Sequence, residues 1–124
     1  MQNPENKIFD KWGDCIRSGW LALPAILLEQ QDALKLTCLE MIILQNLLLA
    51  WRQTDTKIYI RSSTMAKRLN LHQRSIQRGL TELIKKGFIH RIKAEHKDDQ
   101  VWTYFDVKPT VIKLNEFKRL NYVN

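Results

Sequence analysis

The chain has 124 residues, of which 44% are hydrophobic and 27% are charged, and its formal net charge is +7. These proportions are typical of a globular protein and argue against a chain that is disordered throughout. No apolar run approaches the ~18 residues of a membrane span, and the polar N-terminus lacks the pattern of a signal peptide. We therefore expect a single domain over residues 1–124, located in the cytoplasm and associated with the nucleoid if its partner is DNA.

The positive charge is concentrated in the middle of the chain. Residues 1–60 hold six Lys or Arg against seven Asp or Glu, and residues 98–124 hold four against four. Residues 61–97 hold ten against two, a net charge of +8. A charge that only keeps a protein soluble would be spread along the chain, whereas a basic patch on one structural unit indicates a polyanionic partner.

The N-terminal segment predicts little regular structure. Residues 1–11 are polar and predict a frayed end. Trp12 and Trp20 follow close together, and two tryptophans in such a segment more often anchor it against a core than bind a ligand. Pro24 is placed to open a helical turn over residues 25–28.

Residues 32–51 predict the strongest helix, which is apolar almost without interruption over 41–44 and 47–51. A helix that is apolar on most faces is buried on most faces. We therefore expect this central helix in the core, with the alternative that part of it forms a dimer contact.

Three short strands are predicted around the basic segment. Residues 57–60 form a β-type run, and residues 88–93 and 101–105 form two more, joined by a polar turn over 95–99. The turn lacks the Asn-Gly or Asp-Gly of a two-residue hairpin, so a longer loop is expected. Asp98 and Asp99 argue against its tip lying deep in a nucleic-acid groove.

A last amphipathic helix is predicted over residues 110–122. Its apolar positions share one face: Val111, Leu114, Phe117 and Leu120. This face either packs on the domain or forms a dimer contact, and the sequence does not separate these alternatives.

Residues 62–87 predict two helices joined by a short break. The first covers residues 64–69, with Ser62 and Ser63 available as N-caps, and the second covers residues 73–86. Residues 70–72 form the break, and Gly87 stands where a helix stops.

The second helix has two distinct faces. Apolar side chains recur at helical spacing on one of them: Ile76, Leu80, Leu83 and Ile84. Long donor side chains and a hydroxyl occupy the other: Arg74, Gln77, Arg78, Thr81 and Lys85. Such a face is usually just solvated. Arg and Gln also reach base edges in a major groove, and the charge distribution favours that use here.

The run from Arg74 to Ile89, R-S-I-Q-R-G-L-T-E-L-I-K-K-G-F-I, resembles the recognition helix of a winged helix-turn-helix DNA-binding protein. Ala66 matches the small residue that lets the two helices approach. Asn70 stands where the family usually has Gly and tolerates a left-handed conformation, and His72 stands where the N-cap is usually Ser. The resemblance covers residues 9–122 and is to regulators and replication-initiator modules of bacteria, plasmids and phages. It implies a mainly α fold with a small antiparallel β-hairpin wing over residues 88–105.

The resemblance and the charge together predict sequence-specific binding of double-stranded DNA, with residues 73–86 in the major groove. The expected base-reading residues are Arg74, Gln77 and Arg78, with Gln73, His72, Ser75 and Thr81 close by. The expected phosphate contacts are Arg61, Lys67, Arg68, Lys85, Arg91, Lys93 and Lys97. His72 is equally suited to touch DNA or to act as a plain polar cap.

A transcriptional regulator is favoured over an initiator module, because the chain ends shortly after the wing without a second module. A symmetric regulator would bind two half-sites as a homodimer.

No enzymatic motif is present, so no catalysis, cofactor, metal or small-molecule ligand is predicted. Cys15 and Cys38 are far apart and read as reduced thiols, and the three histidines lack metal spacing. Asp98–Asp99 is only a weak hint of a nuclease.

Two alternatives from other classes remain. One is a protein-interaction winged helix that docks through the central helix and the tryptophan-rich N-terminus. The other is RNA binding, with Trp102 and Tyr104 as the candidate stacking residues.

Overall fold

The computed structural model describes residues 4–95 and 101–122. Its elements run in the order α1 (Pro4–Trp12), a 3₁₀ helix η1 (Gly13–Ser18), α2 (Ala25–Glu29), α3 (Cys38–Ala50), α4 (Ser62–Leu69), α5 (Gln73–Lys85), β1 (His90–Glu95), β2 (Val101–Asp106) and α6 (Lys108–Asn121). The fold is mainly helical with an antiparallel two-stranded sheet after the helix pair α4–α5, which confirms the predicted winged-helix arrangement. None of the described helices is long and apolar enough to span a bilayer.

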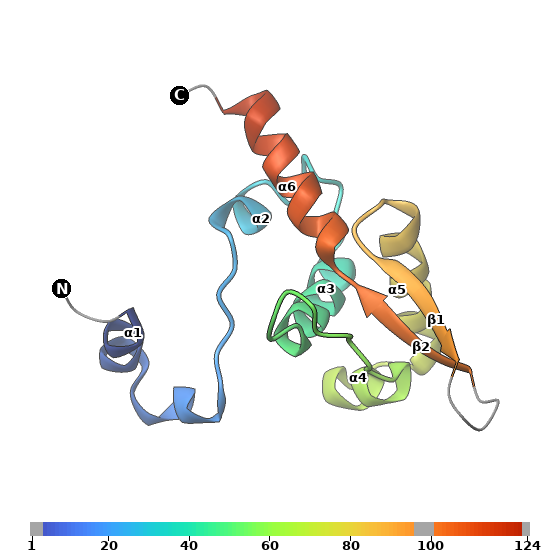
Figure 1. Cartoon of the computed structure of the whole chain (residues 1–124), viewed down its shortest axis with the longest axis horizontal. Coiled ribbons are helices and arrows are strands. Elements are labelled where there is room, and N and C mark those ends of the chain that lie inside the picture. The colour runs from blue at the N-terminus through green and yellow to red at the C-terminus, as the bar shows by residue number, and fades with distance from the viewer. Residues whose placement is uncertain (1–3, 96–100, 123–124) are drawn as a thin grey trace.

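Most of the elements form one body from which the N-terminal segment stands apart (Figure 1). Helices α3, α4 and α5 lie together, with the hairpin along α5 and with α6 running away from the hairpin's end. Helix α1 and η1 lie to one side, joined to the body by the extended residues 19–24. We call residues 4–24 the arm.

Helix α3 is the centre of the core, as predicted, but it begins later than residue 32. Ile43, Leu44 and Leu47 have no exposed surface. The Thr37 hydroxyl accepts a hydrogen bond from the backbone N–H of Glu40, and the Glu40 carboxylate accepts one from the N–H of Thr37. This reciprocal cap fixes the start at Cys38. Residues 31–35 form turns instead.

The pair α4–α5 has the predicted shape with different caps. Asn70 adopts the left-handed conformation (φ 54°, ψ 49°), and the N–H of Leu71 bonds the carbonyl of Ala66 across the turn at 2.9 Å. Helix α4 begins at Ser62, with Arg61 at the N-cap position and no side-chain cap bond, so the prediction that serines cap this helix is wrong.

Gly87 ends α5 as predicted. Its φ of 82° is accessible to glycine at little cost. The N–H groups of Gly87 and Phe88 bond the carbonyls of Ile84 and Leu83 at 3.1 and 3.0 Å, which closes the helix and turns Phe88 into the core.

Helix α5 lies close against α3 because of one glycine. The predicted apolar face is confirmed, since Ile76 and Leu83 are fully buried. A Cβ at Gly79 would collide with the side chain of Ile43, which is itself fully buried. Gly79 therefore permits the close approach that positions α5.

The sheet is smaller than predicted at one edge. In the register of β1 and β2, His90 pairs with Asp106 and Lys93 with Thr103. The predicted strand over 57–60 is reduced to a single bridge between Ile58 and Phe105. The wing begins at His90 because Phe88 and Ile89 are buried in the core.

The two ends of the chain differ most from prediction. Residues 4–12 form a helix where a frayed end was expected. Trp12 is 60% exposed and Trp20 is 45% exposed, so the prediction that they anchor this segment against a core is wrong. Helix α6 starts at Lys108, two residues early, and only Leu114 of its predicted apolar face is fully packed while Val111 and Leu120 stay exposed.

Candidate nucleic-acid interface

Helix α5 presents its predicted polar face to solvent. Its buried side is held by α3 and α4, and the residues on the opposite side are all exposed: Arg74, Gln77, Arg78, Thr81 and Lys85. These positions fall three, four or seven residues apart, so they form one continuous stripe. The packing of α5 thus leaves two arginines and a glutamine directed away from the body.

The other expected base-reading residues are placed less directly. His72 and Gln73 are exposed and Ser75 is half-buried. Gln73 Nε2 donates to Ser62 Oγ at 3.0 Å, which ties the start of α5 to the start of α4. Thr81 Oγ1 donates to the carbonyl of Gln77 at 2.9 Å. His72 stands at the N-cap position without a cap bond from its side chain, so the alternative of a plain polar cap is not realised.

A groove of about 1120 Å³ separates α5 from the sheet. Polar side chains of α5 form one wall, and Arg91 and Lys93 of β1 form the other. The segment from Tyr59 to Ser63 also lines it. No Asp or Glu is among the described residues that line it. We call this the basic groove, because it brings Gln73, Gln77 and Thr81 together with Arg61, Arg91 and Lys93.

The expected phosphate-contacting residues that the structure describes are exposed, and two of them also contact other side chains of the chain. Arg61, Lys67, Arg68, Lys85, Arg91 and Lys93 all reach the surface, while Lys97 lies outside the described residues. An Arg68 guanidinium nitrogen donates to Asn46 Oδ1 at 2.6 Å, which links α4 to α3. Lys85 lies 3.6 Å from the Glu82 carboxylate. The remaining cations surround the stripe on α5.

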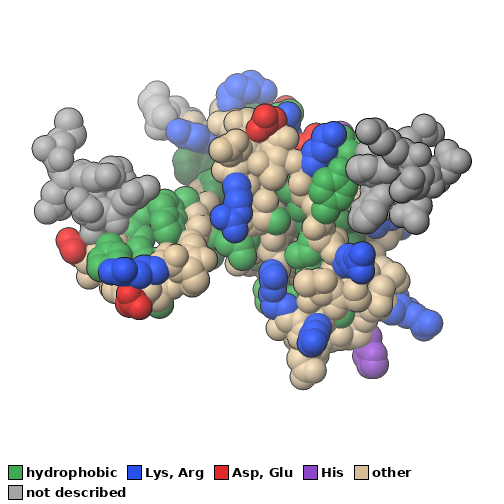
Figure 2. All heavy atoms as spheres, turned by 60° about the horizontal axis from the view of Figure 1, so that its bottom comes forward, with side chains coloured by type: hydrophobic (Ala, Val, Ile, Leu, Met, Phe, Trp, Pro, Cys, Tyr) green, Lys and Arg blue, Asp and Glu red, His purple; other side chains and the backbone are tan. Residues whose placement is uncertain are grey.

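The surface view shows the same segregation of charge (Figure 2). On the face drawn there, Lys and Arg side chains dot the lower part of the body without an acidic side chain among them. The acidic side chains on this face stand on the arm at the left and near the top. The positive field of this face is therefore not cancelled by neighbouring carboxylates.

Among the described cations of residues 61–97, Lys86 is the one that pairs with a buried carboxylate. Its Nζ lies 2.6 Å from Glu40 Oε1 and 2.7 Å from the carbonyl oxygen of Lys35. Burial by itself would raise the pKa of Glu40, but hydrogen bonds from Lys86 and Thr37 outweigh it and hold the pKa below its ordinary value. The charge of Lys86 therefore stabilises the junction of α3 and α5.

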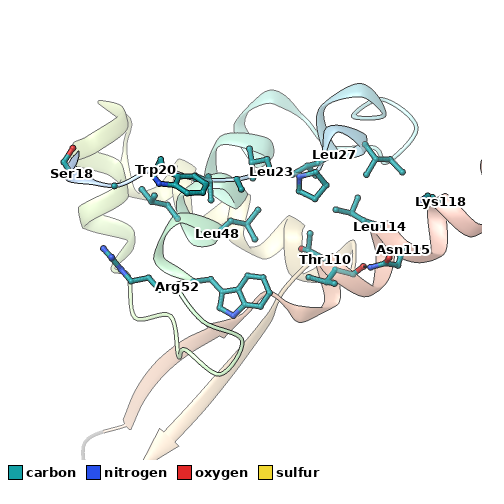
Figure 3. A pocket seen from close by; sticks show the side chains of 18 residues that line it. Ser18, Trp20, Leu23, Leu27, Leu48, Arg52, Thr110, Leu114, Asn115 and Lys118 are labelled. Carbon is teal, nitrogen blue, oxygen red and sulfur yellow. Dashed lines mark hydrogen bonds between the residues drawn. The ribbon is translucent and has the colours of Figure 1, made fainter. Parts of the chain in front are cut away.

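A second hollow, of about 750 Å³, lies between the arm, the end of α3 and α6. Figure 3 shows Trp20 and Leu23 of the arm, Leu48 of α3 and Leu114 of α6 around it. Arg52 and Lys118 stand at its edge. We call it the apolar hollow, and it also includes Leu49 and Val111, which belong to the two helices considered for a dimer contact.

Several features of the site are absent from the sequence prediction. Gly79 gave a signal, since a glycine on the apolar side of an amphipathic helix indicates close backbone packing. No sequence pattern indicated the ion pair between Glu40 and Lys86 or the position of Tyr59 in the same groove as α5. Each feature depends on residues that lie far apart in the chain. Within the described residues, no three His, Cys, Asp or Glu side chains are grouped to hold a metal.

The fold and sequence can be compared with known proteins. No curated protein is similar enough in sequence to count as a match. The N-terminal domain of the DnaD protein from Geobacillus kaustophilus has a similar structure, with a TM-score of 0.64, 18% identity, and coverage of 97% of this chain and 93% of that one. At this identity the similarity shows the fold alone.

Two archaeal structures are more distant. A protein from Methanosarcina mazei described as a possible transcriptional regulator has a TM-score of 0.47 and 18% identity, over 73% of this chain and 78% of its own. ST1889 from Sulfolobus tokodaii has a TM-score of 0.45 and 15% identity, over 79% and 99%. The sequence of residues 23–122 matches the model of the DnaD N-terminal domain, which is most of the chain. The chain therefore belongs to the DnaD N-terminal domain family.

Proposed function

We propose that this chain binds double-stranded DNA through α5 and the basic groove. The observation that carries the proposal is the continuous exposed stripe of Arg74, Gln77 and Arg78 beside a groove whose far wall holds Arg91 and Lys93. A helix fits the major groove of B-DNA, and its exposed side chains then face the base edges. The proposal includes no catalytic step and no cofactor or metal.

In this arrangement the exposed stripe of α5 and the cations that line the groove have different roles. Arg74 and Arg78 offer the fork of donors that pairs with guanine, and Gln77 offers the amide that pairs with adenine. Arg61, Arg91 and Lys93 meet the phosphates beside the major groove and set the register of α5. Specificity then depends on α5, and the salt dependence depends mostly on the wing wall.

The family membership favours a role in DNA replication for this binding. The sequence-based preference for a transcriptional regulator gains no support from it and remains the alternative. Either role places the chain in the cytoplasm, on the nucleoid.

We also propose that the chain acts as a homodimer that closes the apolar hollow. Phe9, Trp12 and Trp20 of the arm are exposed, and so are Leu49 and Val111, which line the hollow. A second copy of the chain would remove this apolar surface from water. Sedimentation equilibrium tests the proposal: Val111→Asp should shift a dimer to monomer, and Ile112→Asp, on the same helix outside the hollow, should not.

DNA binding is tested by fluorescence anisotropy with a random-sequence duplex library at two salt concentrations, followed by sequencing of the retained duplexes. We expect steep salt dependence and an enriched motif. Tandem repeats of that motif would favour replication, and a palindrome would favour a regulator. Salt-sensitive binding without enrichment would contradict the specific readout, and no binding at low salt would contradict DNA binding altogether.

A further inference from the structure

The sheet carries a pair of aromatic rings on the face turned away from the core. Side chains alternate between the two faces of a strand, so Ile58 and its bridge partner Phe105 point to the core, where both are buried. Tyr59 and Tyr104 then lie on the opposite face. Their ring centres are 5.6 Å apart with an angle of 52° between the planes.

Only Tyr59 of this pair lines the basic groove, next to Arg61, while Tyr104 lies outside the groove's lining. Tyr59 is 47% exposed. Lys57 Nζ lies 5.3 Å from the ring centre of Tyr104. Tyr59 therefore contacts a tilted second ring that itself carries a cation, while nearly half of the surface of Tyr59 remains exposed.

Strand pairing does not require this exposed ring. Ile58 is 1% exposed, and the N–H of Phe105 bonds its carbonyl at 3.0 Å, so the segment is held by its neighbour. An open aromatic face among cations is the chemistry that holds an unpaired base, with the ring stacking on the base and the cations meeting its phosphates. The bases inside a duplex are already stacked on each other and do not offer their faces.

We propose that Tyr59, backed by Tyr104 and Lys57, binds an unpaired base of a DNA strand that leaves the duplex held on α5. The preferred ligand is then a junction between duplex and single strand. This inference rests on the proposed function, because the basic groove must hold the duplex for its strand to reach Tyr59. It names a ligand class that a duplex-binding helix alone does not select.

The test compares a blunt duplex with the same duplex carrying a single-stranded tail of about six nucleotides, on either strand, by anisotropy with the full chain. The measured quantity is the ratio of the two Kd values, so a change in duplex affinity cancels. We expect one of the tails to tighten binding by about tenfold, which is within the range of stacking one base on an aromatic ring. A 2-aminopurine base in that tail should lose fluorescence on binding.

The variants identify the ring as the cause. Tyr59→Leu keeps apolar bulk without an aromatic face and should bring the ratio to about one, whereas Tyr59→Phe should retain the gain. Thermal unfolding checks that both variants fold. A tail made of RNA distinguishes a DNA ligand from any unpaired strand, and an equal or larger gain with RNA would overturn the assignment to DNA.

The outcomes separate this inference from the proposed function. Equal binding of blunt and tailed duplexes, or a gain that survives in Tyr59→Leu, would overturn the stacking site while leaving duplex binding intact. Binding of the tailed duplex without the blunt one would contradict the duplex proposal and, with it, a junction held on α5. Failure of both ligands to bind would contradict both.

Discussion

The apolar hollow is lined by α3, and the basic groove is lined by α5, which packs on α3, but the two differ in almost every property. The groove is lined by Arg61, Arg91 and Lys93 and by polar side chains of α5, without an acidic residue among its described lining. The hollow is lined mainly by tryptophan, leucine and valine side chains from the arm, α3 and α6. One suits a polyanion and the other suits an apolar partner. A small domain can thus offer two unlike surfaces when its core helix is shared.

A single substitution at the contact between α3 and α5 should disrupt both surfaces. Gly79→Leu places side-chain atoms in space filled by the buried Ile43, and the helices α3 and α5 must separate. We expect the free energy of unfolding to fall by about 3 kcal/mol, with loss of DNA binding and of the dimer. Chemical denaturation measures the change. Thr81→Leu, exposed on the same helix, should change stability by less than about 0.5 kcal/mol, and an unchanged Gly79→Leu would contradict the packing.

Two neighbouring lysines separate the charge on the exposed stripe of α5 from the charge that holds α3 and α5 together. Lys86→Met leaves Glu40 buried without its partner and should lower the free energy of unfolding by about 2 kcal/mol, with the salt dependence of DNA binding unchanged. Lys85→Met should leave the free energy of unfolding nearly unchanged and reduce the salt dependence of DNA binding, because Lys85 is exposed. Denaturation and salt titration of the two variants check this, and equal effects would show that the distinction is wrong.

The same ion pair predicts how stability depends on pH. The pKa of Glu40 is lower in the folded chain than its ordinary value of 4.5, so its contribution is complete above about pH 4.5 and is lost as the pH falls further. Unfolding followed from pH 7 to 3 should therefore show a loss of stability in that acidic range. Glu40→Gln should show a smaller acid-dependent loss than the wild type. A parallel pH curve for the variant would contradict the role of this carboxylate.

The exposed stripe of α5 and the wing wall of the groove should respond differently to substitution. Arg78→Ala should cost about 1–3 kcal/mol on the preferred sequence and relax specificity at one base pair, because a base-reading contact is lost. Competition with single-base variants of the enriched motif measures this. An equal loss on preferred and random duplexes would show that Arg78 does not read a base.

The smallest expected effect is on the wing wall. Lys93→Ala should weaken binding to all duplexes alike and reduce the slope of log K against log salt by about one. The dimer should be unaffected, because Lys93 lies outside the apolar hollow. A loss of affinity that depends on the DNA sequence would instead indicate that Lys93 reads a base.

The sequence was informative where local chemistry decides the structure. The apolar stripe of α5, the left-handed Asn70 and the stop at Gly87 follow from the residues themselves and were predicted. The polar stripe was predicted as well, since one face of a helix is fixed once the other is buried. These features define the pair α4–α5 and the exposed stripe on α5.

The remaining features were not visible in the hydrophobic pattern alone. The start of α3 was missed because Thr37 and Glu40 form a cap inside what appeared as one long helical pattern. The exposure of Trp12 and Trp20 was missed because their type suggests burial, while the arm leads them away from the body. The β-type run over 57–60 was predicted, but its reduction to the single bridge beside Tyr59 is not encoded by a local pattern.

The central claim is that α5, and not positive charge in general, binds DNA. The most direct measurement is duplex affinity of Arg74→Ala/Arg78→Ala against Arg17→Ala/Arg119→Ala, which removes the same charge from exposed sites on the arm and α6. We expect the α5 variant to lose at least about tenfold in affinity and the control to lose little, since the control cations lie on η1 and α6 and not on the proposed recognition helix. Equal losses in the two variants, or no loss in the α5 variant, would contradict the account.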